Sequence, residues 1–337
     1  MSIPIPAPTP EDQSPSPNQA PHGPDDMSIT PQTPKTFGLK DAQISARDGE
    51  WVSVQDLIMG EDLHVKEFVV DDEMYVLECY PAVQGEGLYM GAPTTFVRLA
   101  GCTVGCVYCD TKYSWKARRG DRYTAYGLAD YALSVTPAYA RRFALTGGEP
   151  LEHPWYLVQK FLDRATNHWG AHTTIETSGV FLPDLEEALA NGVSLLGPRI
   201  LWSVAPKLDL AHANYPFPDL MEWVVLMQNF GHPLQFKFVV GSVEDLEEVG
   251  EKLTEARRGK FASALSSTPI FLQPVTAYNE KTPMEEVSRG IIELTKKLQD
   301  HLLHNFDDPG MKPYHYFPKL FIRPQQHSIY YGAKRQV

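Results

Sequence analysis

Apolar and polar positions alternate along residues 75–301 in two repeating patterns. Short apolar runs rich in β-branched residues predict buried strands, and apolar residues at helical spacing predict helices between them. The predicted strands are 75–80, 96–100, 143–146, 173–177, 200–204, 234–240 and 270–273. The predicted helices are 126–135, 154–168, 183–190, 219–228, 243–257 and 284–301. About six βα units in this order predict an α/β fold whose parallel sheet forms a partial, open barrel.

The first 74 residues have a different pattern. Residues 1–36 are dominated by Pro, Ser, Thr, Gln and Asp. Because such a segment buries too little apolar surface to offset its ordering entropy, it predicts a disordered tail. Residues 37–74, with strand-like runs at 51–54 and 64–70, predict an accessory N-terminal segment. The partial-barrel domain is then predicted to cover residues 75–337.

The composition and charge of the chain argue against nucleic-acid and membrane partners. The chain has 30 Lys and Arg against 42 Asp and Glu, a net charge of −12, which argues against a nucleic-acid-binding surface. It has no apolar run long enough for a bilayer, and its first residues lack the basic and apolar regions of a signal peptide. We therefore expect a cytoplasmic protein without a membrane partner. In a reducing compartment, clustered cysteines indicate metal binding rather than disulfides.

Three of the four cysteines follow the predicted strand at 96–100. Cys102, Cys106 and Cys109 have the spacing C-x3-C-x2-C. Three thiolates can hold three corners of a cubane iron–sulfur cluster, which leaves the fourth iron open to a ligand from outside the protein. The alternative is structural zinc, which normally takes four protein ligands. Cys79 lies on another predicted strand, so a histidine would have to complete a zinc site.

The next predicted strand ends in Thr146-Gly-Gly-Glu-Pro150. Its two glycines let the backbone approach a ligand closely, and Glu149 can accept a hydrogen bond from an amine. By itself the sequence is equally typical of an ordinary turn. One βα unit after the cysteine loop, it favours a ligand site at the carboxyl ends of the strands.

Taken together, the cysteine loop and Gly-Gly-Glu-Pro resemble the radical S-adenosylmethionine superfamily. The resemblance implies that the open iron binds the amino and carboxylate groups of S-adenosylmethionine, whose cleavage yields a 5′-deoxyadenosyl radical. Further segments resemble the 7-carboxy-7-deazaguanine synthase family, over about residues 75–337. These segments are Gln84-Gly-Glu-Gly87, Phe96–Leu99, Cys109-Asp-Thr111, Ile175–Gly179, Ala205-Pro-Lys207, Phe236–Val240, Gln273-Pro274 and Arg323–His327.

This second resemblance implies a lyase of queuosine and 7-deazapurine biosynthesis. It would contract the ring of 6-carboxy-5,6,7,8-tetrahydropterin to 7-carboxy-7-deazaguanine with loss of ammonia. The implied cofactors are a [4Fe-4S] cluster, S-adenosylmethionine and Mg²⁺. The implied partners are an electron donor such as flavodoxin or ferredoxin and a second copy of the chain in a homodimer. Two alternatives stay open: an activase that installs a glycyl radical on a partner protein, and a non-enzymatic zinc-binding interaction module.

The resemblance also implies roles for individual residues, with Thr111 as the magnesium ligand. The implied cofactor-binding residues are Tyr108, Cys109, Asp110, Gly148, Glu149, Ala205, Pro206, Lys207, Gln273, Pro274, Val275 and Thr276. The implied substrate-binding residues are Val83, Gln84, Gly85, Glu86, Arg98, Thr146, Glu176 and His327. Arginine is a natural bidentate partner for a carboxylate, although Arg98 is also interpretable as part of a structural salt bridge. His327 is equally interpretable as a packed C-terminal histidine.

Overall fold

The computed structural model describes residues 43–45, 51–53, 73–183, 197–208, 215–276, 282–304 and 319–331. The chain divides into two compact units, residues 1–68 and 69–337. In the first unit, β1 (Gln43–Ser45) pairs antiparallel with β2 (Trp51–Ser53). The predicted tail over 1–36 and the predicted strand over 64–70 lie outside the described residues. So does the predicted helix over 183–190, apart from its first residue.

A nine-stranded sheet forms the second unit, in the order β11-β10-β9-β8-β7-β6-β4-β3-β5. Its strands are β3 (Glu73–Val83), β4 (Pro93–Leu99), β5 (Asp121–Thr124), β6 (Arg142–Gly147), β7 (His172–Thr177), β8 (Ile200–Val204), β9 (Leu234–Val240), β10 (Ile270–Pro274) and β11 (Leu320–Ile322). The seven adjacent strands β4, β6, β7, β8, β9, β10 and β11 are parallel to one another. At the other edge, β3 pairs antiparallel with both β4 and β5. The sheet ends at β5 and β11 without closing, which confirms the predicted open, mostly parallel architecture.

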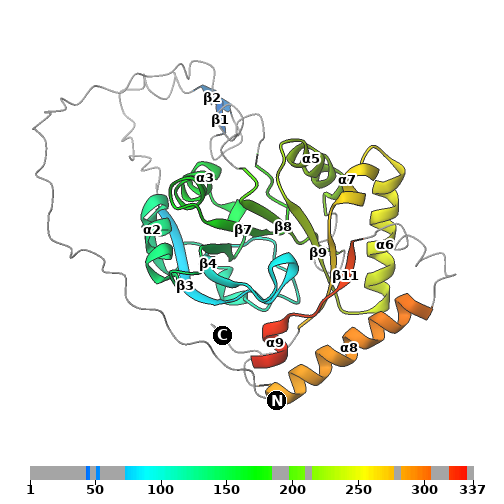
Figure 1. The fold of residues 1–337 in the computed structure, drawn as a ribbon. Coiled ribbons are helices and arrows are strands. Elements are labelled where there is room, and N and C mark those ends of the chain that lie inside the picture. Colours follow the sequence, from blue (N-terminus) through cyan, green and yellow to red (C-terminus); the bar gives the residue numbers. More distant parts are fainter. Residues whose placement is uncertain are drawn as a thin grey trace, which may run out of the picture. The chain divides into compact units, whose positions relative to one another are not determined.

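Helices cover the outside of the curved sheet (Figure 1). They are α2 (Ala125–Val135), α3 (Trp155–Asp163), α5 (Phe217–Asn229), α6 (Val243–Arg258), α7 (Ala262–Ser267) and α8 (Met284–His304). The short α9 (Gln326–Tyr331) follows β11 and is bonded to α8, where the Ser288 hydroxyl donates to the Ile329 carbonyl. Side-chain caps fix where two of them begin. Thr124 accepts from the Gly127 backbone N–H at the start of α2, and Ser242 and Asp245 form a reciprocal capping box at α6.

The strands with continuous apolar sequences are the most deeply buried. β8 and β10 are buried at every position, as expected for parallel strands covered on both faces. Trp202 of β8 packs edge-to-face against Trp223 of α5, with ring centroids 4.9 Å apart. Phe217 of α5 lies against the Phe236 and Phe238 rings of β9. Such aromatic pairs contribute beyond their buried area, and they fix α5 onto the sheet.

Several local features differ from the sequence-based expectation, among them the short elements β1, α7 and α9, which were not predicted. The helix predicted over 154–168 is α-helical only to Asp163 and continues as a π turn over Arg164–His168. The short strands β5 and β11 were not predicted, because neither has a long apolar or alternating run. Among the described residues, no helix combines the length and apolar character needed to cross a membrane.

The parallel strands place their following loops at one edge of the sheet. The cysteine loop follows β4, the Gly-Gly-Glu-Pro turn follows β6, and residues 205–207 follow β8. Residues 275–276 follow β10, and residues 323–327 follow β11. Ligands of open parallel sheets bind at this carboxyl edge.

Candidate active site

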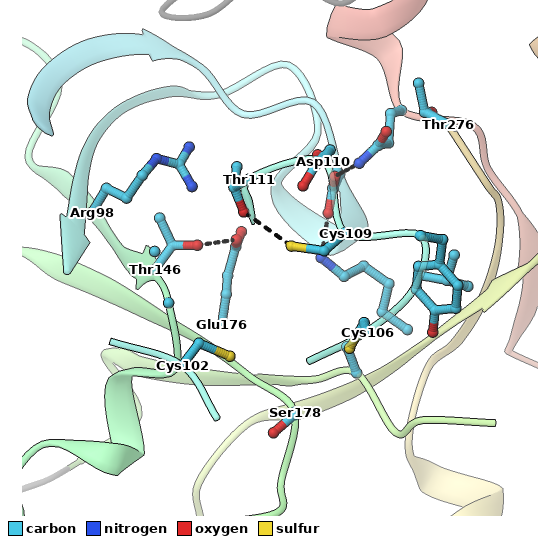
Figure 2. A pocket seen from close by; sticks show the side chains of 18 of the residues that line it. Arg98, Cys102, Cys106, Cys109, Asp110, Thr111, Thr146, Glu176, Ser178 and Thr276 are labelled. Atoms are coloured by element: carbon cyan, nitrogen blue, oxygen red, sulfur yellow. Dashed lines mark hydrogen bonds and ion pairs between the residues drawn. The ribbon is translucent and has the colours of Figure 1, made fainter. Parts of the chain in front are cut away.

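A cavity of about 980 Å³ lies at this edge of the sheet. All residues that the sequence predicted for metal, cofactor or substrate line it, except Gly85, Pro206 and Pro274. Each of these three is a chain neighbour of a residue that does line it. Figure 2 shows the labelled cysteines, Arg98 and Glu176 around the shared space. The structure therefore brings together residues from nearly the whole second unit.

The three cysteines of the loop have free thiols. Cys106 is buried, and Cys102 and Cys109 are half-buried. Burial raises the pKa of the Cys102 thiol to about 11 and also raises that of Cys106. Thiols whose pKa is raised in this way are poorly reactive as free nucleophiles, whereas a bound metal deprotonates a coordinating thiol. The raised pKa values therefore argue against a reactive free thiolate in the metal-free protein.

The donors present can be compared with what a cluster and a single ion require. Within the described parts of the chain, no group of three His, Cys, Asp or Glu side chains is arranged to hold one metal ion. A structural zinc ion requires its ligands around one atom, whereas a cubane cluster presents a separate iron to each cysteine. Three cysteines on one loop that face one cavity (Figure 2) fit a cubane cluster, which takes one thiolate on each of three irons.

Backbone contacts hold the cysteine loop against the segment that follows it. The Gly101 N–H donates to the Ser114 carbonyl at 2.8 Å, and the Cys102 N–H donates to the Trp115 carbonyl at 3.2 Å. Within the loop, the Cys109 N–H donates to the Cys106 carbonyl. The Thr111 hydroxyl lies 3.6 Å from the Cys109 sulfur (Figure 2). The predicted magnesium ligand thus lies in the cavity beside the third cysteine.

The glycines of the Gly-Gly-Glu-Pro turn permit a close approach to the protein's own backbone. The Gly148 N–H donates to the Leu99 carbonyl at 2.9 Å, and the Glu149 N–H donates to the Gly101 carbonyl at 2.8 Å. A Cβ on Gly148 would lie 1.9 Å from the Gly101 oxygen, and one on Gly147 would lie 2.3 Å from the Leu99 nitrogen. The turn is therefore packed against the start of the cysteine loop, with no room there for a side chain.

The Glu149 carboxylate joins the loops after β6 and β7. It is 2% exposed and accepts hydrogen bonds from the Thr177 hydroxyl, the Ser178 N–H, the Ser178 hydroxyl and the Leu151 N–H. An ionised carboxylate has about four acceptor positions, so these four donors occupy all of them. Acceptance from a cofactor amine by this side chain stays a prediction, and the contacts present make Glu149 a link between two loops of the site.

Arg98 is both part of a salt bridge and part of the cavity wall. Its Nε lies 2.9 Å from a Glu78 carboxylate oxygen, with the two side chains 13% and 10% exposed. The guanidinium also lies 6.0 Å from the Tyr113 ring centroid. The structural salt bridge considered from the sequence is thus present. The side chain still faces the cavity (Figure 2), and its contact with a substrate carboxylate stays a prediction.

Glu176 connects two other predicted substrate residues. The Gln84 side-chain amide donates to one of its carboxylate oxygens at 3.1 Å. The Thr146 hydroxyl donates to the other at 2.9 Å (Figure 2). These residues come from β7, the loop after β3, and β6. Two acceptor positions on Glu176 remain after these bonds, so the carboxylate can still bind N–H donors of a ligand.

His327 packs against Gly85 while also lining the cavity. A Cβ on Gly85 would lie 2.2 Å from the His327 Nδ1 atom, so only glycine fits there. The Gly85 carbonyl accepts from the Gln326 N–H at 3.0 Å. These contacts seat the C-terminal segment on the loop after β3. His327 is therefore a packed residue, and its additional contact with a substrate stays a prediction.

The sequence reasoning missed Lys237 and Gln325. The Lys237 ammonium forms an ion pair with Glu86, and the Gln325 amide donates to the other Glu86 oxygen. Burial alone would raise the pKa of Glu86, but the charges of Lys237 and His327 and these hydrogen bonds lower it to about 2. The available signal was a lysine in the middle of an otherwise largely apolar strand, Leu234–Val240.

Comparisons with known proteins match these features. Residues 83–202 match a family described as a 4Fe-4S single cluster domain. The 7-carboxy-7-deazaguanine synthase of Pyrobaculum aerophilum is 31% identical over 208 residues, which are 61% of this chain and 81% of that protein. The synthase of the same name from Escherichia coli is 29% identical over 222 residues, 61% of this chain and 86% of that protein. A crystal structure of QueE from Escherichia coli aligns with a TM-score of 0.48 and 23% identity, covering 78% of this chain and 100% of that one.

Proposed function

The chain belongs to the 7-carboxy-7-deazaguanine synthase family, and from this premise we propose that it converts 6-carboxy-5,6,7,8-tetrahydropterin to 7-carboxy-7-deazaguanine with loss of ammonia. The observation that carries the proposal is a single cavity of about 980 Å³. The three loop cysteines, the Gly-Gly-Glu-Pro turn and a set of polar residues suited to a pterin all line it. A large cavity with a few convergent polar groups is the expected form of such a site.

Cys102, Cys106 and Cys109 would hold a [4Fe-4S] cluster, with S-adenosylmethionine at its open iron. When bound, this pair supplies the radical chemistry that removes a hydrogen atom from the substrate. The chain's own residues bind the cofactor and the substrate, orient them toward each other and shield them from solvent. We assign the cofactor wall to Tyr108, Asp110, Gly148, Glu149, Ala205, Pro206, Lys207, Gln273, Pro274, Val275 and Thr276. Most of these line the cavity from the same carboxyl edge as the cysteines.

The remaining polar wall is assigned to the substrate. Arg98 and Thr111 lie on the part of the cavity where a carboxylate would find a cation and a hydroxyl (Figure 2). Glu176, held by Gln84 and Thr146, offers acceptors for ring N–H groups. Val83, Glu86 and His327 complete this side, and Gly85, which packs against His327, is assigned with them. A fixed set of donors and acceptors orients the reacting carbon toward the cofactor, which is how positioning contributes to rate.

Thr111 is proposed as the protein ligand of Mg²⁺, because a hard oxygen donor together with a substrate carboxylate and water suits this ion. Replacing Thr111 with valine keeps the side-chain shape and removes the hydroxyl. We expect turnover to fall by about 100-fold or more and its dependence on added Mg²⁺ to disappear, while the cluster absorbance is retained. Turnover measured over a magnesium titration checks this.

Thr111→Ser is the matched control, because it keeps the hydroxyl; it should retain most of the turnover and its magnesium dependence. If Thr111→Val responded to Mg²⁺ as the unchanged protein does, the hydroxyl would not be the ligand. Loss of absorbance in either variant would instead point to a role in the packing of the cysteine loop.

The activity itself is tested by anaerobic turnover. Cluster-loaded protein, supplied with S-adenosylmethionine, a reductant and Mg²⁺, should convert the carboxytetrahydropterin to a product with the mass of 7-carboxy-7-deazaguanine. S-adenosylmethionine should be regenerated, so 5′-deoxyadenosine should stay far below the product. Cluster-loaded protein that forms no product would refute the proposal. Release of 5′-deoxyadenosine in proportion to a glycyl radical on a partner protein would instead support an activase.

The remaining partner and location assignments are also proposals that follow from the family. They are a one-electron donor such as flavodoxin or ferredoxin, a homodimer and a cytoplasmic location. A net charge of −12 supports a small-molecule substrate rather than a nucleic acid.

A further inference from the structure

Lys237 is a buried cation in the wall of the substrate side of the cavity. It lies on β9, where the neighbouring Phe236 and Phe238 are fully buried apolar residues. Its side chain is 9% exposed and forms an ion pair with Glu86, 151 positions earlier in the chain. A buried charge costs stability unless it is paired. The carboxylate of Glu86 therefore makes a lysine tolerable at this position of the strand.

Glu86 keeps part of its hydrogen-bonding capacity free. One carboxylate oxygen accepts from the Gln325 amide and the other from the Lys237 ammonium. A carboxylate offers about two acceptor positions per oxygen, so one remains on each. Glu149, also in the cavity wall, has none left. Glu86 lines the cavity and has one acceptor position left on each oxygen, which is the number that a ligand edge with two parallel N–H donors requires.

The charged groups around Glu86 come from several elements. Lys237 comes from β9, and His327 comes from α9. Both lower the pKa of Glu86, against the effect of burial. Burial lowers the pKa of Lys237, but Glu86, Glu176 on β7 and Asp110 in the cysteine loop together raise it above its usual value. Lys237 thus stands among three carboxylates, and its charge has the largest part in keeping Glu86 ionised.

We propose that Lys237 determines substrate specificity by fixing Glu86 as an acceptor-only carboxylate that binds the N3–H and 2-amino donors of a 2-amino-4-oxopyrimidine ring. The inference rests on the proposed function, whose substrate has such a ring. A 2,4-dioxopyrimidine presents a carbonyl in place of the amino group and would set an acceptor against an acceptor. A protonated Glu86 would donate to that carbonyl and lose the discrimination.

Binding of two probes tests this, measured by anaerobic titration calorimetry on cluster-loaded protein with S-adenosylmethionine. The probes are 6-carboxypterin, which has the amino group, and 6-carboxylumazine, which has a carbonyl there. The unchanged protein should bind the pterin about 100-fold more tightly or better, because a site built for a donor rejects the analogue that lacks it. The preference should be constant from mildly acidic to mildly alkaline pH, since Glu86 is ionised throughout.

Lys237→Met removes the charge and keeps the length. Without the lysine, burial raises the pKa of Glu86, so the carboxylate is protonated as the pH falls. We expect the preference for the pterin to drop to less than about 10-fold at the acidic end and to recover as the pH rises. If Lys237 had a role in packing alone, Lys237→Met would weaken the binding of both probes equally at every pH. Lys237→Arg, which keeps the charge, should retain the preference.

The double variant Glu86→Gln with Lys237→Met keeps the test decisive if the single variant does not fold, because it leaves no unpaired charge. It should lose the preference at every pH. Retention of the full preference in either Met variant would overturn the inference. Equal binding of both probes by the unchanged protein would also overturn it, while leaving the family activity intact. Failure to bind either probe, with no turnover, would refute the proposed function itself.

Discussion

Replacing Cys106 with alanine is expected to yield a colourless protein whose turnover falls by well over about 100-fold, more than the loss of an outer-shell contact at a metal site costs. Cys106 is the most buried cysteine of the loop. With Cys102 and Cys109 it forms the set of thiols that line the cavity. Its removal would leave a second iron without a protein ligand, so the cluster should not be retained. Visible absorbance, iron content after anaerobic reconstitution, and mass detection of the product check the expectation.

Cys79→Ala is the matched control. Cys79 lies on β3 opposite Val97 and is not among the residues that line the cavity. Burial raises its pKa to about 12, which makes it an inert thiol. The control should keep its colour, iron and turnover. Iron retained by Cys106→Ala at the level of the unchanged protein would contradict the assignment, and so would iron lost from Cys79→Ala alone.

The central strands could be predicted from the sequence because buried parallel strands consist of consecutive apolar residues. The predicted ranges 200–204 and 234–240 coincide with β8 and β9. Helix ends were less well predicted. For example, the helix predicted to end at 301 extends as α8 to His304. Helix ends depend on caps and contacts rather than on apolar spacing.

The antiparallel edge shows what local pattern cannot encode. β5 has the sequence Asp-Arg-Tyr-Thr and is mostly exposed, so its strand conformation comes from pairing with β3. The pairing of β3 with β4 shifts register between Val76 and Glu78. Without this bulge, Leu77 would stand opposite Arg98; with it, Glu78 does, which allows the salt bridge.

The candidate site also contains residues that the sequence could predict and residues that it could not. The cysteines, Thr111 and the Gly-Gly-Glu-Pro turn are contiguous motifs, and their loops meet because parallel strands end at one edge. Lys237, by contrast, is one position in a strand, and its partner Glu86 lies 151 residues away. Gln325 is 239 residues from the same carboxylate. Such pairs are created by the order of strands in the sheet, which local sequence does not specify.

Replacing Gly148 with alanine is expected to lower the free energy of unfolding by about 3 kcal/mol or more and turnover by about 100-fold. The added Cβ would lie 1.9 Å from the Gly101 carbonyl oxygen, a backbone atom that cannot rotate away. The turn must then move from the cysteine loop, which breaks the bonds from Gly148 to Leu99 and from Glu149 to Gly101. Thermal unfolding measures the loss of stability, and anaerobic turnover with mass detection of the product measures the loss of activity.

Gly197→Ala is the control that distinguishes the effect of the steric contact at Gly148 from the general effect of replacing a glycine with alanine. A Cβ on Gly197 meets nothing within 4 Å, and its φ is outside the left-handed region. Alanine there should leave stability unchanged or raise it by about 0.4–1 kcal/mol, because it restricts the unfolded chain. If Gly148→Ala were as stable and as active as Gly197→Ala, the turn would not be seated on the cysteine loop. A loss confined to Gly148→Ala would show that the two motifs of the site form one packed unit.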